Sequence, residues 1–150
     1  MKILIVEDDY LQAEWIYEKL KEAIPEATFL RVNTELEFRS RFDEIANTQP
    51  DIAVMDVMLR WTDPSPDLTL PPVEIQKEGF YRAGLRLERL LAGDERTANV
   101  PVILYTVLER ADLNHELSNL PARVQHLPKQ SELTPLIQKI RELTHQQQVT

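Results

Sequence analysis

Five polar residues of this sequence could together carry out phosphoryl chemistry, and each lies at or just after the end of a short apolar run. They are Glu7, Asp8, Asp56, Thr106 and Lys129. Clustered carboxylate oxygens attract Mg²⁺, and a carboxylate can act as a nucleophile that becomes an aspartyl phosphate. A divalent cation and a lysine would offset the negative charge of an incoming phosphoryl group. A threonine hydroxyl could donate a hydrogen bond to one of its oxygens.

The acids near the N-terminus do not all have the same expected role. Glu7, Asp8 and Asp9 are consecutive, and two carboxylates about 5 Å apart repel by roughly 3 kcal/mol at an effective dielectric near 20. A bound cation would offset that cost. Asp9 also precedes a helical pattern, and the helix dipole favours an acid at that position. We therefore expect Asp9 to serve the helix and the other two acids to face a cation.

Strand-like and helix-like segments alternate five times along the chain. The predicted strands are Ile3–Val6, Ala27–Val32, Ile52–Met55, Pro101–Tyr105 and Val124–Leu127. The predicted helices cover residues 10–24, a segment that begins at the capping box Thr34–Glu37, Phe80–Ala92, roughly Glu109–Asn119, and a last helix from Ser131 or Thr134. This alternation predicts an α/β fold with one doubly wound, five-stranded parallel sheet and helices on both faces. Ligands of such folds bind at the carboxyl ends of the strands, where the five polar residues would converge.

Length and composition limit the class of protein. The 150 residues favour one domain. A net charge of −8 argues against binding to nucleic acid or to an anionic membrane, and the lack of cysteine excludes disulfides and thiolate nucleophiles. No apolar stretch approaches the length of a membrane span, and the N-terminus does not have the pattern of a signal peptide. We expect a cytoplasmic protein.

The segment from about Arg60 to Lys77 departs from the alternating pattern. Four of the ten prolines of the chain lie within it, at positions 64, 66, 71 and 72. Such a stretch can form neither a regular helix nor a central strand, so we expect a long surface loop beside Asp56. It could fold over the site, dock a partner or be a passive insertion.

Four stretches, ILIVEDD, DIAVMDVML, PVILYT and HLPKQ, resemble in sequence and order the receiver domain of two-component response regulators. The resemblance covers about residues 2–144, with the segment from Arg60 to Lys77 as an insertion and residues 145–150 as a polar tail. It implies the flavodoxin-like receiver fold with strand order 2-1-3-4-5.

The resemblance also implies a role for each site residue. Asp56 would be the phosphoacceptor. Asp8 and Asp56 would hold Mg²⁺ together with the backbone carbonyl of Met58, and Glu7 would act through a metal-bound water.

The other two site residues, Lys129 and Thr106, lie where the sequence departs from the family. The resemblance implies that Lys129 pairs with the phosphoryl group and that Thr106 moves toward it to report the modification. The family has a proline after the lysine, where this chain has Gln130. It has an aromatic residue three positions before the lysine, where this chain has His126, and a small residue after the threonine, where this chain has Val107.

The function implied is a signalling switch rather than an enzyme. A histidine kinase or a phosphotransfer protein would phosphorylate Asp56, and output would pass through an unidentified partner protein, because nothing after residue 144 could fold. The resemblance leaves open whether the protein forms a homodimer. One alternative is a pseudo-receiver that binds partners without phosphorylation. A weaker one is a Mg²⁺-dependent phosphohydrolase with an aspartyl nucleophile, since Met58 stands where such enzymes of the haloacid-dehalogenase-like family carry a second aspartate.

Overall fold

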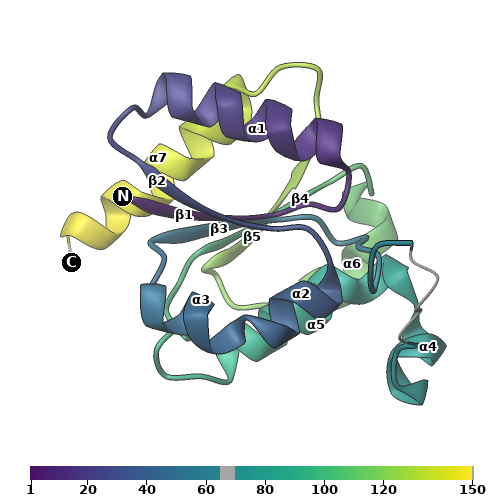
Figure 1. The fold of residues 1–150 in the computed structure, drawn as a ribbon. Helices are drawn as coiled ribbons and strands as arrows, with labels where there is room; N and C mark the ends of the chain where they lie inside the picture. Colours follow the sequence, from purple (N-terminus) through teal and green to yellow (C-terminus); the bar gives the residue numbers. More distant parts are fainter. Residues whose placement is uncertain (65–69, 150) are drawn as a thin grey trace.

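A five-stranded parallel sheet lies between two layers of helices in the computed structural model, which describes residues 1–64 and 70–149 (Figure 1). The strands are β1 (Lys2–Val6), β2 (Thr28–Val32), β3 (Ile52–Met55), β4 (Val102–Thr106) and β5 (Val124–Pro128). Their order in the sheet is β2-β1-β3-β4-β5, and all neighbours pair in parallel. The predicted fold class and strand order are therefore confirmed.

The helices divide between the two faces of the sheet. One face carries α1 (Tyr10–Ala23) and α7 (Thr134–Val149), and the other carries α2 (Glu35–Ser40), α3 (Phe42–Thr48) and α5 (Ala83–Ala92) (Figure 1). Shorter helical pieces are α4 (Val73–Glu78), η1 (Phe80–Arg82), η2 (Arg110–Leu113) and α6 (Asn114–Leu117). None of the helices in the described ranges is both long enough and apolar enough to span a membrane.

The strands are apolar on both faces because helices cover both faces. Along β1, Ile3 and Ile5 pack into the cluster beneath α1 and α7, whereas Leu4 and Val6 pack into the cluster beneath α2 and α5. Alternate side chains of a strand point to opposite faces. A strand covered on both sides therefore appears in the sequence as a continuous apolar run.

The segment that begins at the capping box forms two helices rather than one. Thr34 caps α2 as predicted, since its Oγ1 accepts the N–H of Glu37 at 3.1 Å. The chain leaves helical geometry at Arg41, with φ −101° and ψ 14°, and α3 begins at the next residue. Leu36 of α2 is only partly buried, whereas Phe38 is fully buried.

The prediction that the whole proline-rich segment is a loop was wrong for its second half. Residues 73–78 form α4, with Pro72 at its N-cap. The prolines of the segment all precede Val73, so every residue of α4 keeps the backbone N–H that a helix needs. Residues 65–69 lie outside the described part of the chain. At the other end of the molecule, α7 continues through Val149, into the residues expected to form a tail.

A buried ion pair that the sequence analysis missed joins α2, α5 and the end of the insertion. The Arg86 guanidinium donates to both carboxylate oxygens of Glu35, at 2.6 and 2.9 Å. Its remaining nitrogen donates to the carbonyl of Gly79 at 3.0 Å. The Glu35 and Arg86 side chains are only 1% and 6% exposed. Arg39 also donates to Glu35 Oε2, at 3.0 and 3.2 Å, so two guanidinium groups replace the water that this carboxylate has lost.

Loss of this pair should be costly. We expect Arg86→Met to lower the free energy of unfolding by about 1–3 kcal/mol, because the buried Glu35 carboxylate loses two hydrogen bonds and keeps only those from the partly exposed Arg39. Arg89→Met on the same helix is the control, because that side chain is 62% exposed, and it should change stability by less than about 1 kcal/mol. Urea denaturation followed by circular dichroism measures both, and equal losses would contradict a structural role for the buried pair.

Candidate functional site

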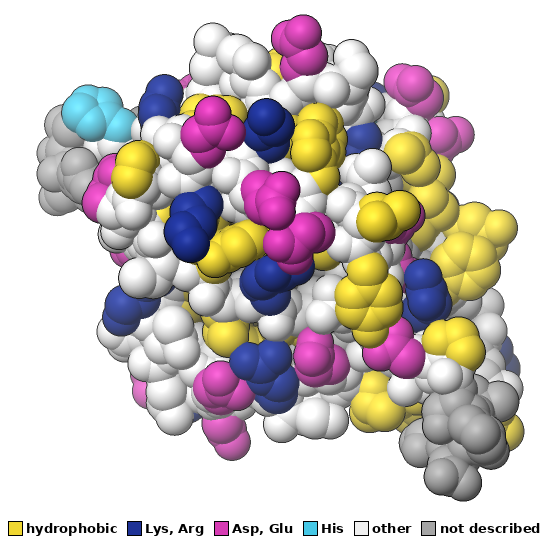
Figure 2. Space-filling model, turned by 45° about the horizontal axis from the view of Figure 1, so that its top comes forward, with side chains coloured by type: hydrophobic (Ala, Val, Ile, Leu, Met, Phe, Trp, Pro, Cys, Tyr) yellow, Lys and Arg dark blue, Asp and Glu magenta, His cyan; other side chains and the backbone are white. Residues whose placement is uncertain are grey.

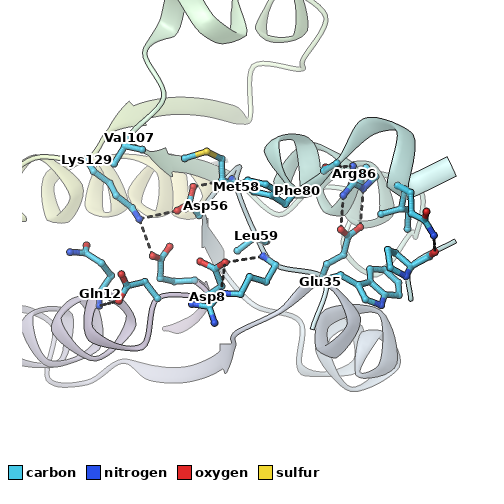
Figure 3. A pocket seen from close by; sticks show the side chains of 18 of the residues that line it. Asp8, Gln12, Glu35, Asp56, Met58, Leu59, Phe80, Arg86, Val107 and Lys129 are labelled. Atoms are coloured by element: carbon cyan, nitrogen blue, oxygen red, sulfur yellow. Dashed lines mark hydrogen bonds and ion pairs between the residues drawn. The ribbon is translucent and has the colours of Figure 1, made fainter. Parts of the chain in front are cut away.

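The polar residues that follow β1, β3 and β5 meet at the carboxyl edge of the sheet (Figure 3). The Lys129 ammonium lies between two carboxylates and donates to Asp56 Oδ2 at 2.9 Å and to Glu7 Oε1 at 3.0 Å. Glu7 and Asp56 are 3% and 6% exposed. Three residues that are far apart in the sequence thus form one buried charge cluster.

Asp56 is fixed from two further directions. Its Oδ1 accepts the backbone N–H of Met58 at 3.1 Å, and its own N–H donates to the Val6 carbonyl at 3.0 Å. Gly84 packs directly against this turn, and its N–H donates to the Val57 carbonyl at 2.8 Å. A Cβ at residue 84 would overlap the backbone of Asp56. Helix α5 can therefore approach the end of β3 only because this residue has no side chain.

Asp8 and Asp9 have separate partners, as predicted. Asp8 Oδ2 accepts the backbone N–H of Arg60 at 2.8 Å, and the Arg60 Nε lies 3.5 Å from the same oxygen. Asp9 is the N-cap of α1, where its Oδ1 accepts the N–H groups of Leu11 and Gln12 at 3.0 and 3.2 Å. The prediction that Asp9 serves the start of this helix is confirmed, and the structure adds that it does so as the N-cap.

The site carries more negative charge than its lysine balances. Burial and then the neighbouring Asp56 raise the pKa of Glu7 to about 8, against the opposing effect of Lys129. Burial also raises the pKa of Asp8, although Arg60 partly opposes it. Burial would lower the pKa of Lys129, but Asp56 and Glu7 outweigh it and raise that pKa. A further cation would stabilise the ionised carboxylates.

The chemistry of these donors suits Mg²⁺. Within the described residues, no group of three or more His, Cys, Asp or Glu side chains could hold a metal ion by itself. Mg²⁺ in proteins commonly takes only one or two carboxylates and keeps several waters. Asp8, Asp56, Glu7 and Met58 line one cavity, so two carboxylates, a carbonyl and water are a fitting donor set.

Thr106 and His126 both bind the turn that follows β4. Thr106 is fully buried, and its Oγ1 accepts the N–H of Leu108 at 3.3 Å. The carbonyl of Leu108 lies 2.9 Å from His126 Nε2. The backbone N–H and carbonyl of Leu108 are thus both held. Thr106, which binds the N–H, is the residue expected to move, and His126, which contacts the carbonyl, stands where the family has an aromatic residue.

A ladder hydrogen bond holds the lysine where the family has a Lys-Pro peptide. The N–H of Lys129 donates to the Thr106 carbonyl at 2.8 Å, which extends the pairing of Thr106 with Pro128 in the sheet. No cis peptide bond occurs in the described ranges. The register of β5 against β4 therefore places the ammonium beside Asp56.

The cavity at the site extends beyond the predicted residues. It has a volume of about 890 Å³ and reaches from the acidic cluster to Leu59, Trp61, Ile75, Phe80 and the Glu35–Arg86 pair (Figure 3). Val107 lines its rim and is 61% exposed. Part of this outer wall comes from the insertion, which therefore borders the site. No periodic pattern in the sequence indicated this wall.

The burial of Glu7 predicts a pH dependence of stability for the metal-free protein. With its pKa raised from 4.5 to about 8, folded Glu7 keeps a proton that the unfolded chain releases, so its contribution is complete below pH 4.5 and lost as the pH rises through 8. One pH unit in a pKa corresponds to about 1.4 kcal/mol. Glu7→Gln should therefore become more stable than the wild type by a few kcal/mol between about pH 5 and pH 9.

Urea titrations in a chelating buffer across this pH range measure the difference. Glu18→Gln, at an exposed position of α1, is the control and should follow the wild type. A difference between Glu7→Gln and wild type that does not change with pH would show that the environment of Glu7 does not disfavour its charge.

Comparisons with known proteins were made by sequence and by structure. Neither a family model nor a curated protein sequence matches this chain. The signal receiver domain of a histidine kinase from Syntrophus aciditrophicus is 25% identical, with a TM-score of 0.69 over 99% of this chain and 93% of that one. A sensor protein from Polaromonas sp. JS666 is 19% identical, with a TM-score of 0.70 over 97% and 96%.

A third solved structure is the receiver domain of a sensor histidine kinase from Pseudomonas aeruginosa, with a magnesium ion coordinated in its active-site cleft. It is 17% identical, with a TM-score of 0.64 over 96% of this chain and 97% of that one. These likenesses extend over nearly the whole chain and agree with the strand order of its sheet. The chain therefore has the fold of the receiver domains of two-component signalling proteins.

Proposed function

We propose that this protein is a phosphorylatable switch of a two-component phosphorelay. Asp56 accepts a phosphoryl group from a histidine kinase or a phosphotransfer protein, and an unidentified partner protein reads the result. The observation that best supports this proposal is the contact of Lys129 Nζ with Asp56 Oδ2 at 2.9 Å, in a cavity that the acid pair also lines.

The transfer is a substitution at phosphorus. A carboxylate oxygen of Asp56 forms the new O–P bond, and the bond from phosphorus to the histidine nitrogen of the donor breaks, with that nitrogen keeping the electron pair. Lys129 offsets the charge that arrives, and the N–H of Met58 keeps the carboxylate oriented. Mg²⁺ held by Asp8, Asp56 and the Met58 carbonyl, with Glu7 acting through a water, would supply further positive charge.

The turn after β4 is the proposed readout of phosphorylation. The Thr106 hydroxyl oxygen accepts the N–H of Leu108 in the present arrangement. Movement of this hydroxyl toward a phosphoryl oxygen would release that N–H and shift the turn, whose carbonyl His126 also contacts. A phosphoryl group that stays on the protein and biases two conformations is a switch rather than a turnover enzyme.

The surface fits a protein partner better than a nucleic acid. Figure 2 shows acidic and basic side chains interspersed on one face of the molecule, without a continuous basic patch there. The net charge is −8, and nucleic-acid affinity depends on many lysine and arginine contacts to phosphates. The missing proline after Lys129 favours the pseudo-receiver alternative, yet the Lys129 ammonium contacts Asp56 without it.

Phosphorylation can be tested directly by mass spectrometry. With Mg²⁺ and acetyl phosphate, the intact wild type should gain the mass of one phosphoryl group, and Asp56→Asn should gain none, because its side-chain amide is not a nucleophile. Asp43→Asn is the control at an aspartate that is 89% exposed, and it should be modified as fully as the wild type.

Two results would contradict the switch. An unmodified wild type, or an equal mass gain in Asp56→Asn, would exclude Asp56 as the acceptor under these conditions. Repeated turnover of a phosphoester by the wild type would favour the phosphohydrolase instead.

Mg²⁺ should stabilise the protein through Asp8 and not through Asp9. We expect added Mg²⁺ to raise the melting temperature of the wild type, since a ligand that binds only the folded state stabilises it. Asp8→Ala should abolish this rise. Asp9→Ala should keep most of it, although the lost helix cap lowers basal stability by about 1 kcal/mol. Thermal scans with Mg²⁺ and with chelator give the comparison, and a full Mg²⁺ effect in Asp8→Ala would refute the assignment.

A further inference from the structure

Asp8 differs from the other two site carboxylates in its cationic partner. Lys129 binds Glu7 and Asp56, whereas the Arg60 Nε lies 3.5 Å from Asp8 Oδ2. The Arg60 side chain is 45% exposed and that of Asp8 is 18% exposed. A partly solvated cation therefore lies beside the carboxylate that is the proposed direct ligand of Mg²⁺.

The backbone of Arg60 is held independently of its side chain. The carbonyls of Arg60 and Trp61 accept the first two N–H groups of α2, from Glu35 at 2.9 Å and Leu36 at 2.8 Å. The N–H of Arg60 that orients Asp8 is part of this anchored segment. A substitution at residue 60 can thus remove the guanidinium while the backbone hydrogen bond to Asp8 stays in place.

A second contact anchors the start of the insertion. Three residues further along the insertion, Asp63 Oδ2 accepts the hydroxyl of Tyr10 at 2.8 Å. The start of the insertion is therefore tied to α2 by its backbone and to α1 by a side chain. Both ties keep Arg60 at the mouth of the acidic cluster, where it lines the same cavity as Asp8 and Asp56.

We propose that the Arg60 guanidinium is an internal counter-ion of Asp8 that Mg²⁺ must outcompete, so that Arg60 lowers the Mg²⁺ affinity of the site. This inference rests on the proposed function for the placement of Mg²⁺ at Asp8. A guanidinium at this distance already compensates part of the negative charge of the Asp8 carboxylate. It also repels an arriving divalent cation, with a strength that depends on solvent exposure.

Calorimetric titration of MgCl₂ into chelator-treated protein tests this competition. Arg60→Gln should bind Mg²⁺ roughly two- to fivefold more tightly than the wild type, the range expected from an exposed ion pair. Arg60→Lys keeps the charge and should bind nearly as the wild type does. Arg89→Gln changes the net charge equally at an exposed position of α5, and it should leave the affinity unchanged.

Ionic strength provides an independent readout. High KCl screens partly exposed charges, so the difference between Arg60→Gln and wild type should shrink as KCl is added. Equal or weaker Mg²⁺ binding by Arg60→Gln overturns the counter-ion role alone, because phosphorylation of Asp56 is measured separately. A wild type that binds no Mg²⁺ overturns both this role and the Mg²⁺ requirement of the proposed function.

Discussion

The Lys129 ammonium between Glu7 and Asp56 is the interaction on which the site depends. Two carboxyl groups that are 3% and 6% exposed have lost most of their contact with water, and one ammonium at 3.0 and 2.9 Å compensates them only in part. A buried charge without a partner is strongly destabilising. The three strands that carry these residues must therefore keep their order and register for the cluster to exist.

The sheet meets this requirement through its topology. β1 and β3 are neighbours, and β2 and β4 lie outside them, so the chain leaves β1 toward one side of the sheet and β3 toward the other. Ligand sites of open α/β sheets form where the order reverses in this way. The Glu35–Arg86 pair and the insertion extend the same opening into a larger cavity, which makes the surroundings of Asp56 deeper than the acidic cluster alone.

The comparisons show how far the sequence can change while this fold persists. Identities of 17–25% accompany TM-scores of 0.64–0.70, and no family model matches the chain. The proline after the lysine is absent, but a ladder hydrogen bond from Lys129 to Thr106 holds the loop. Sheet register can thus position this side chain without the Lys-Pro sequence of the family that the chain resembles.

The sequence by itself determined the strands, their order through the resemblance, the residues at their carboxyl ends and the place of Asp9 at the start of a helix. These features follow from short-range periodicity and from the rule that parallel strands end at one edge. Only the tertiary structure decided which charges pair. Lys129 forms ion pairs with Glu7 and Asp56, and Arg60 lies beside Asp8. Arg86 pairs with Glu35, 51 residues away in the sequence. Such pairings depend on how the layers pack and on where the insertion is anchored, and no local pattern encodes either.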